Sequence, residues 1–328
     1  MHRTAKQIHN HLKSANNLAL VSHQNPDGDT LGSAVAMAEY LQTLGKEVRI
    51  FCLSPVPDKF DFLRHIGLVS QDEKIFAQAD TIAVLDSGDL KYAGVAEIIK
   101  DTAATIINID HHATNANYGH INMVVPTASS TTEVVYNFFK TNNIHTTPSM
   151  ACALLTGLIT DTDNFSNSAT TYTSLTAAGE LLRLGANWTL INNQLVRNKS
   201  ISTLKLWGVV LSRLNKKSPS GGSPAGGEEI DMAYTYLTTA DIAEHDASEA
   251  DVEGIANFLN KLDGAKISLF LKEMPAGKIK GSFRTTHEDM DVSALAKKLG
   301  GGGHKKAAGF TADGSITDIV NKITSMIK

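Results

Sequence analysis

The chain has 328 residues, a hydrophobic content of 42%, a charged content of 20% and a formal net charge of −4. This length and composition predict a globular protein of about two domains and exclude a disordered chain. The net negative charge argues against binding to long duplex nucleic acid, because such binding needs many lysine and arginine contacts to phosphates.

The first half of the chain alternates β-rich runs with amphipathic segments. The runs are residues 18–23, 47–51, 81–86 and 105–110, and the amphipathic segments include 30–45 and 95–100. This alternation is typical of βαβ units, which build a parallel sheet covered on both faces. An α/β domain with a parallel sheet is therefore expected at the N-terminal end.

Helices and then a second set of strands are expected further along. Apolar residues recur at helical spacing in residues 130–141, 148–160, 171–185 and 201–214. Residues 215–229 are rich in Gly, Ser and Pro and predict a flexible surface excursion. Strands are then expected at 230–238, 265–273 and 277–286, and helices at 251–262, 291–300 and 315–328.

Three parts follow from this pattern. Residues 1–187 form the first α/β domain, residues 188–227 a helical connector and flexible loop, and residues 228–328 a smaller α/β domain. We expect the active-site cleft between the two α/β domains.

The cysteines and the hydropathy of the chain indicate where in the cell the protein is expected. Cys52 and Cys152 lie far apart without a CxxC spacing, so neither a disulfide framework nor a thiolate zinc site is predicted. The first residues lack the apolar core of a signal peptide, and the apolar stretch at 150–160 is too short to cross a bilayer. We expect a cytoplasmic protein without membrane contact.

Acidic and imidazole side chains stand at the carboxyl ends of the predicted strands and after the segment at 150–160. They are His23, Asp27, Asp29, Asp86, Asp110, His111, His112 and Asp161. Ligands of open parallel sheets bind outside the carboxyl ends of the strands, so we expect these side chains at one rim. Carboxylates crowded there are costly unless cations neutralise them, and the sequence therefore predicts a divalent metal site.

The type of ligand bears on the metal. Imidazole and carboxylate together suit Mn²⁺, with Mg²⁺, Zn²⁺ or Fe²⁺ as competitors. The set offers more ligands than one ion needs and suits two ions bridged by a carboxylate, as in phosphoester hydrolysis. A single aspartate at a strand end is more often a helix cap or turn residue, which is an adequate explanation for Asp89 and Asp163.

Five motifs in order carry a resemblance to a known family. The segments "HQNPDGD", "LDSGD", "IDHH" and "GLITDTD" resemble the four motifs of the DHH phosphoesterases. Residues 300–309, "GGGGHKKAAG", are similar to the signature of the associated DHHA1 domain. Length and spacing most resemble the short bacterial oligoribonucleases, or nanoRNases, that also dephosphorylate 3′-phosphoadenosine 5′-phosphate (pAp).

The resemblance implies a role for each motif residue. One Mn²⁺ would be held by His23, Asp27 and Asp86, and the second by Asp29, Asp86, His111 and Asp161. Asp110 would orient His111, and His112 would face the scissile phosphate. The chain departs from the family at Asp163, where glycine is common. Aspartate tolerates a positive φ less well than glycine, and its carboxylate could also alter metal affinity.

Substrate binding is expected from side chains in both α/β domains. The candidates are Ser129, Ser130, Arg284, Gly301, Gly302, Gly303 and His304. The glycines and His304 would form an anion cradle, Arg284 would grip a phosphate, and the serines would bind an anion at a helix start. A tight turn, an exposed strand arginine and helix capping are the respective alternatives.

The expected activity is hydrolysis of short oligoribonucleotides to mononucleotides and of pAp to AMP, by hydroxide that two metal ions activate. Hydrolysis of pApA or cyclic dinucleotides and exopolyphosphatase action are alternatives within the same chemistry. A silent nucleotide-binding regulator is the alternative from another class, although such a regulator has no reason to keep every expected ligand. The sequence leaves a homodimer open.

Overall fold

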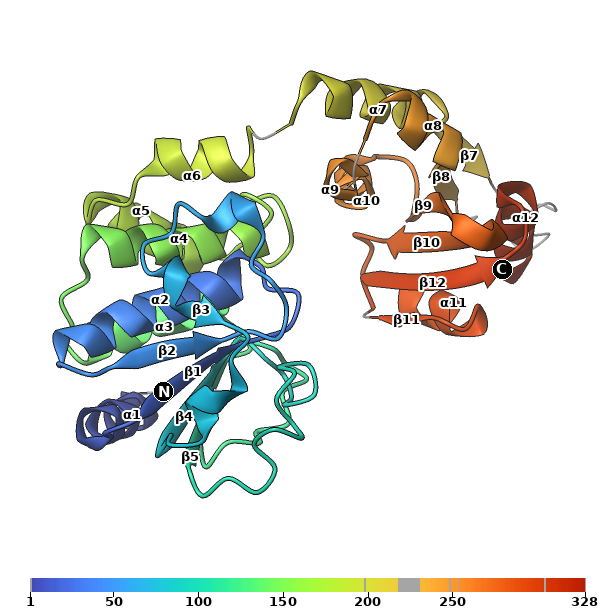
Figure 1. Ribbon diagram of the computed structural model, residues 1–328. Coiled ribbons are helices and arrows are strands. Elements are labelled where there is room, and N and C mark those ends of the chain that lie inside the picture. The colour runs from blue at the N-terminus through green and yellow to red at the C-terminus, as the bar shows by residue number, and fades with distance from the viewer. Residues whose placement is uncertain are drawn as a thin grey trace. The chain divides into compact units, whose positions relative to one another are not determined.

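The structure, a computed structural model, divides into two compact units, residues 1–198 and 199–328 (Figure 1). It describes residues 2–197, 199–217, 231–247, 249–252, 254–303 and 305–327. Most of the excursion expected at 215–229 lies outside these residues, and the boundaries expected at residues 187 and 228 remain predictions. Among the described helices, none combines the length and the hydropathy that a membrane span requires.

The first unit is built on an all-parallel sheet of six strands in the order β3-β2-β1-β4-β5-β6. The strands are β1 (Leu18–Ser22), β2 (Val48–Phe51), β3 (Val69–Ser70), β4 (Thr81–Leu85), β5 (Thr105–Asp110) and β6 (Ile121–Val124). The chain leaves β1 toward one edge, returns to β4 on its other side and continues to the opposite edge. The predicted parallel sheet is confirmed, and β1 and β4 form the switch point at which such sheets bind ligands.

Helices cover one face of this sheet (Figure 1). Helices α1 (His2–Ser14), α2 (Gly28–Thr43) and α3 (Thr131–Thr141) contact its strands. Helices α4 (Pro148–Asp161), α5 (Tyr172–Arg183) and α6 (Trp188–Leu195) form a further layer, in which α4 packs on α2 and α3 and contacts α5 and α6. Helix α2 packs against the sheet and against α4, and it is buried along most of its length. Gly32 makes this close packing possible, because a Cβ there would lie 2.3 Å from the carbonyl oxygen of Ala153 in α4.

Turns and short 3₁₀ helices, rather than α-helices, lie between β2 and β5. The 3₁₀ helices are Asp58–Phe60, Ile66–Leu68 and Glu73–Phe76. The prediction of a helix at residues 95–100 was wrong, because the structure has turns there. Val95 and Ile99 are nevertheless buried against the second face of the sheet. A run this short, rich in β-branched residues, gains little from helix formation.

The second unit contains a mixed sheet of six strands in the order β11-β12-β10-β9-β8-β7. The strands are β7 (Asn215–Lys217), β8 (Met232–Leu237), β9 (Ile267–Met274), β10 (Lys278–Arg284), β11 (Gly302–Gly303) and β12 (Ala307–Asp313). Among the strands that the structure describes in this sheet, only β8 and β9 pair in parallel. The expected smaller α/β domain is thus confirmed, with an antiparallel majority.

Helices pack on both faces of the second sheet. They are α7 (Ile201–Ser212), α8 (Thr239–Glu244), α9 (Glu249–Val252), α10 (Ile255–Phe258), α11 (Val292–Lys298) and α12 (Ile316–Met326), with 3₁₀ helices at Leu259–Lys261 and Pro275–Gly277. The single helix expected at 251–262 was wrong. Gly254 has a φ of 94° between α9 and α10, and this left-handed conformation interrupts the helix.

Candidate metal centre

The loop after β1 presents the first two ligand candidates. His23 follows β1 directly, and its Nδ1 lies 2.8 Å from the carbonyl oxygen of Gln24. That hydrogen bond turns Nε2 toward the carboxylates, 3.4 Å from Asp86 Oδ2 and 3.7 Å from Asp27 Oδ1. Asp27 is also the N-cap of α2, because its Oδ1 accepts the backbone N–H groups of Asp29 and Thr30. Capping and metal binding are compatible uses of this carboxylate, which has about four lone-pair sites.

Asp86 lies at the centre of the cluster. It follows β4 directly, is 2% exposed and has a φ of 60°. Left-handed aspartates are uncommon and recur at functional sites, where the surrounding structure holds them. The Thr131 hydroxyl donates to Asp86 Oδ1 at 2.9 Å. The carboxylate is thereby fixed at the switch point between β1 and β4.

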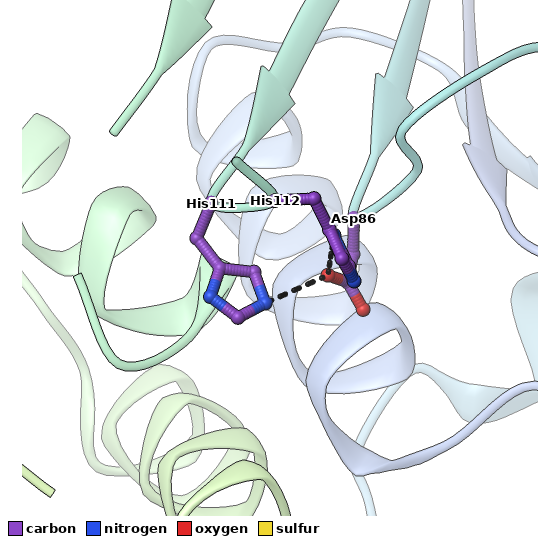
Figure 2. A group of neighbouring side chains, drawn as sticks. All are labelled: Asp86, His111 and His112. Atoms are coloured by element: carbon purple, nitrogen blue, oxygen red, sulfur yellow. Dashed lines mark ion pairs between the residues drawn. The ribbon is translucent and has the colours of Figure 1, made fainter. Parts of the chain in front are cut away.

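The two histidines after β5 face Asp86 (Figure 2). His111 Nε2 and His112 Nδ1 each lie 3.8 Å from Asp86 Oδ1. His111 Nε2 is also 3.1 Å from Asp161 Oδ2, at the end of α4. On the other side of its ring, Nδ1 lies 3.3 Å from the carbonyl oxygen of Ala128.

Asp29 is fully buried at the start of α2. Its carboxylate accepts the backbone N–H groups of Thr131 and Thr132, at 2.6 and 2.8 Å, and so caps α3 from a distant part of the chain. Gly157 in α4 leaves room for it, since a Cβ there would lie 2.7 Å from Asp29 Oδ1. The N-terminus of a helix stabilises this negative charge, and each oxygen keeps a lone pair for a cation.

The structure corrects the expected partner of Asp110. Its Oδ1 lies 2.8 Å from His112 Nδ1, whereas His111 makes no recorded contact with Asp110 among the described residues. Alternate residues share a side at the end of a strand, so residue 110 faces residue 112 and not residue 111. Asn115 donates to the other oxygen of Asp110 at 2.5 Å. Asp110 therefore positions His112.

The cluster is electrostatically poised for positive charge. Burial, followed by the charge of Asp86, raises the pKa of Asp27 to about 6, and the pKa values of Asp29 and Asp161 are raised for the same reasons. Burial alone would lower the pKa of His23, but the hydrogen bond and charge of Asp86 raise it to about 9. A nearby positive charge would favour the ionised form of each of these carboxylates, which burial and mutual repulsion disfavour.

Within the part of the chain that the structure describes, three groups of side chains could hold a metal ion. Within each group, one nitrogen or oxygen atom per residue lies within 4.8 Å of the others. The groups are His23, Asp27 and Asp86; Asp29, His111 and Asp161; and Asp86, His111 and His112. The imidazole and carboxylate donors, together with the crowding of carboxylates, fit divalent cations. The structure thus brings together the residues proposed from sequence for both ions.

Asp163 lies outside this cluster. It has a φ of 47°, is exposed, and its carboxylate accepts from the Ser166 hydroxyl at 3.2 Å. The position thus requires the left-handed conformation that glycine adopts most easily.

The two serines proposed for substrate binding are engaged at the start of α3. The Ser129 hydroxyl donates to Glu133 at 2.7 Å, and the Ser130 hydroxyl accepts the Glu133 N–H at 3.0 Å. Both serines are buried. These contacts favour the helix-capping alternative, and a role in substrate binding remains a prediction.

Arg284 lines a cavity of about 410 Å³ within the second unit. Its Nε donates to Asn257 Oδ1 and its Nη1 to the Phe283 carbonyl, both at 2.9 Å. Lys272, Lys280 and Ser282 line the same cavity. The guanidinium is thus held in place beside other donors, as an anion site requires.

Two of the glycines at 301–303, Gly301 and Gly303, have a packing role in the structure, whereas a Cβ on Gly302 would meet no atom within 4 Å. Gly301, just before β11, lies so close to β12 that a Cβ on it would be 2.1 Å from the carbonyl oxygen of Gly309. Gly303 has a φ of 139°. The anion cradle proposed for these glycines remains a prediction, and His304 lies outside the described residues.

Three residues near the cluster carry no motif signal. Thr131 positions Asp86, Asn115 positions Asp110, and Tyr92 packs on His23 with 4.9 Å between ring centroids. Thr131 and Asn115 are separated from their partners by 45 and 5 positions, with no regular spacing that sequence inspection detects.

Residues 17–158 match the DHH family, N-terminal domain, and residues 229–328 match the DHHA1 domain. The chain is 30% identical over 299 residues to "Bifunctional oligoribonuclease and PAP phosphatase NrnA" from Thermus thermophilus, an alignment that covers 90% of this chain and 84% of that protein. It is 29% identical over 167 residues to "Probable manganese-dependent inorganic pyrophosphatase" from Streptococcus thermophilus, which covers 49% of this chain and 53% of that protein. An exopolyphosphatase-related protein from Bacteroides fragilis has a similar structure, with a TM-score of 0.88, 25% identity, and coverage of 100% and 96%.

Proposed function

Because the chain belongs to the DHH family of phosphoesterases and carries a DHHA1 domain, we propose that it hydrolyses short oligoribonucleotides to mononucleotides and pAp to AMP, using two divalent metal ions. The observation that carries the proposal is the convergence of His23, Asp86, His111 and Asp161 at the switch point of the parallel sheet. The substrates are those in the name of the Thermus thermophilus relative.

The proposed division of ligands follows the distances. One ion would take His23, Asp27 and Asp86, and the other would take Asp29, His111 and Asp161 with Asp86 as the shared ligand. We propose Mn²⁺, since these donors suit it and one relative is named as manganese-dependent. When bound, the ions supply positive charge for the phosphoryl oxygens and hydroxide near neutral pH.

The side chains of the site divide the remaining work. The Asp110 carboxylate holds His112 through Nδ1, which leaves Nε2 for an oxygen of the phosphate. The His112 side chain is 37% exposed, whereas Asp110 is fully buried. His112 would therefore contact the substrate and donate a proton toward the leaving oxygen, while Asp110 holds its orientation.

The Arg284 cavity is the proposed anion site of the second unit. Arg284 retains N–H groups beyond the two that bond Asn257 and Phe283, because a guanidinium carries five donors. Lys280, exposed on the same strand, adds a second cation at the cavity wall. This arrangement suits a phosphate whose oxygens contact the Arg284 guanidinium on one side and the Lys280 ammonium on another.

A rate panel tests the proposal. Purified protein with Mn²⁺ should release AMP from pAp and mononucleotides from di- to pentaribonucleotides. The panel includes pApA, short DNA and polyphosphate, the last because the Bacteroides fragilis protein is named as exopolyphosphatase-related. Absence of turnover on pAp and short RNA, with metal content confirmed, would contradict the proposal. Faster turnover of polyphosphate than of pAp and short RNA would make polyphosphate the proposed substrate, and the proposed role of the metal ions would stay the same.

A further inference from the structure

Tyr92 is an aromatic side chain held at the rim of the metal centre. It lies in the loop after β4, and its ring packs on His23 with 4.9 Å between the centroids and a tilt of 35°. Its backbone N–H donates to Asp89 Oδ1 at 2.7 Å, and its carbonyl oxygen accepts the Gln24 N–H at 3.3 Å. These bonds fix the loop on which the ring is presented.

The phenol is both exposed and close to the carboxylates. Tyr92 is 45% exposed although one side of its ring contacts His23. His23 Nε2 lies 3.4 Å from Asp86 Oδ2 and 3.7 Å from Asp27 Oδ1, so a ring that packs on His23 lies beside the carboxylates of the cluster. Within the described part of the chain, no hydrogen bond from this hydroxyl is recorded. The hydroxyl is thus a donor beside the proposed reaction site, with no recorded partner among the described residues.

We propose that the Tyr92 hydroxyl donates a hydrogen bond to a non-bridging oxygen of the substrate phosphate. The inference rests on the proposed function. A phosphate that approaches a rim of carboxylates needs donors as well as cations to offset the repulsion. A lysine or arginine at this position would pair with the aspartates, whereas a neutral phenol can donate to the phosphate instead.

Two substitutions separate the hydroxyl from the ring. Tyr92→Phe keeps the packing on His23 and removes only the donor, whereas Tyr92→Leu removes the ring as well. Tyr172→Phe is the matched control, because Tyr172 is 83% exposed on α5. The measurements are kcat/KM for pAp and a diribonucleotide, manganese content, and the affinity for AMP by calorimetry with Mn²⁺ present.

The expected result is a loss of about tenfold in kcat/KM for Tyr92→Phe, the size of one hydrogen bond to a charged group. AMP affinity should fall in parallel while manganese content stays at the level of the unsubstituted protein. Tyr92→Leu should add little to this loss, and Tyr172→Phe should change nothing.

Other outcomes would overturn the inference. Normal activity in Tyr92→Phe with a loss in Tyr92→Leu would assign the ring to base stacking or to shielding of His23. Loss of manganese in Tyr92→Phe would make the hydroxyl a support of the metal centre. An unsubstituted protein that neither turns over the substrates nor binds AMP would remove the proposed function and this inference together, whereas normal turnover in Tyr92→Phe removes the inference alone.

Discussion

The two sheets of the chain gather polar side chains in different ways. In the first unit, parallel strands β1, β4 and β5 end at one edge, so His23, Asp86 and Asp110 meet although they lie far apart in sequence. In the second unit, antiparallel strands β9 and β10 bring side chains together across one face, where Lys272 pairs in register with Lys280. Strand direction thus decides whether polar side chains from different strands meet at an edge of the sheet or on one of its faces.

The charges collected at the two places also differ. The edge of the parallel sheet holds carboxylates, and burial followed by the charge of Asp86 raises the pKa values of Asp27 and Asp29 there. The face of the mixed sheet presents Lys272, Lys280 and Arg284 to one cavity. The first arrangement suits cations and the second suits anions. The comparison predicts that a substitution can remove metal binding at the edge of the first sheet without weakening anion binding on the face of the second, and the reverse.

The largest effect is expected from Asp86→Ala. Asp86 is near enough to His23, His111 and His112 to serve both proposed ions. Both ions should be lost, and activity should fall on the order of 10³-fold, because the charge that stabilises the phosphoryl oxygens goes with them. Manganese content and kcat are the measurements. Retention of both ions would contradict the bridging role.

Arg284→Ala is the counterpart in the second unit. We expect KM to rise about tenfold, the size of one bond to a charged group, with manganese content unchanged. Lys278→Ala is the matched control, since Lys278 is exposed on the same strand but does not line the cavity. Equal metal loss in Asp86→Ala and Arg284→Ala would break the division between the two sheets.

Asp110→Asn tests the corrected contact with His112. The substitution should lower kcat about 10- to 100-fold, because an amide supports the imidazole less well than a carboxylate does. Manganese should remain bound, since Asp110 contacts His112 and not His111. Loss of one ion together with activity would instead support the orientation of His111 that the sequence suggested.

The smallest effect concerns an ion pair that belongs to neither proposed site. Asp241 in α8 accepts two hydrogen bonds from Arg213, at 2.5 and 2.8 Å, and this contact lowers the pKa of Asp241. A lowered folded-state pKa stabilises the protein above the ordinary aspartate pKa of about 3.9, and the contribution is lost as the pH falls below it. The free energy of unfolding of the second unit should therefore decrease between about pH 4 and pH 2.

Arg213→Gln sharpens this test. It should lower the free energy of unfolding at pH 7 by about 1–2 kcal/mol, between the values for surface and buried pairs. The decrease in the free energy of unfolding between about pH 4 and pH 2 should become smaller at the same time. In a Trp188→Phe background, Trp207 in α7 reports on the second unit alone. Lys140→Gln, which breaks the more exposed pair with Glu180, is the control in the first unit. An unchanged acid dependence in Arg213→Gln would contradict the assignment.

Local patterns predicted the framework well. Alternating apolar runs predicted the parallel sheet, and the positions of His23, Asp86 and Asp110 after strands predicted a shared rim. The prediction succeeded because parallel strands must all end at the same edge. It failed for the helices expected at 95–100 and 251–262, where β-branched residues and Gly254 favour turns and a break.

Side-chain partners were the least predictable part of the site. Sequence assigned Asp110 to its neighbour His111, but the alternation of side chains at the strand end directs it to His112. It carried no signal for the donation from Asn115 to Asp110. The sequence also carried no signal for the contact of Tyr92 with His23, which depends on the loop after β1 and the loop after β4.

Residue types and their order along the chain specify which side chains are available and at which strand end each one stands. Composition, periodicity and motif order are local properties, and they sufficed for the family, the sheet and the candidate ligands. Folding in three dimensions is what makes Asp29 cap α3 across 102 positions, Asp86 adopt a left-handed conformation, and Asp110 support His112. These contacts depend on the packing of distant segments and on backbone angles, which residue spacing along the chain does not specify.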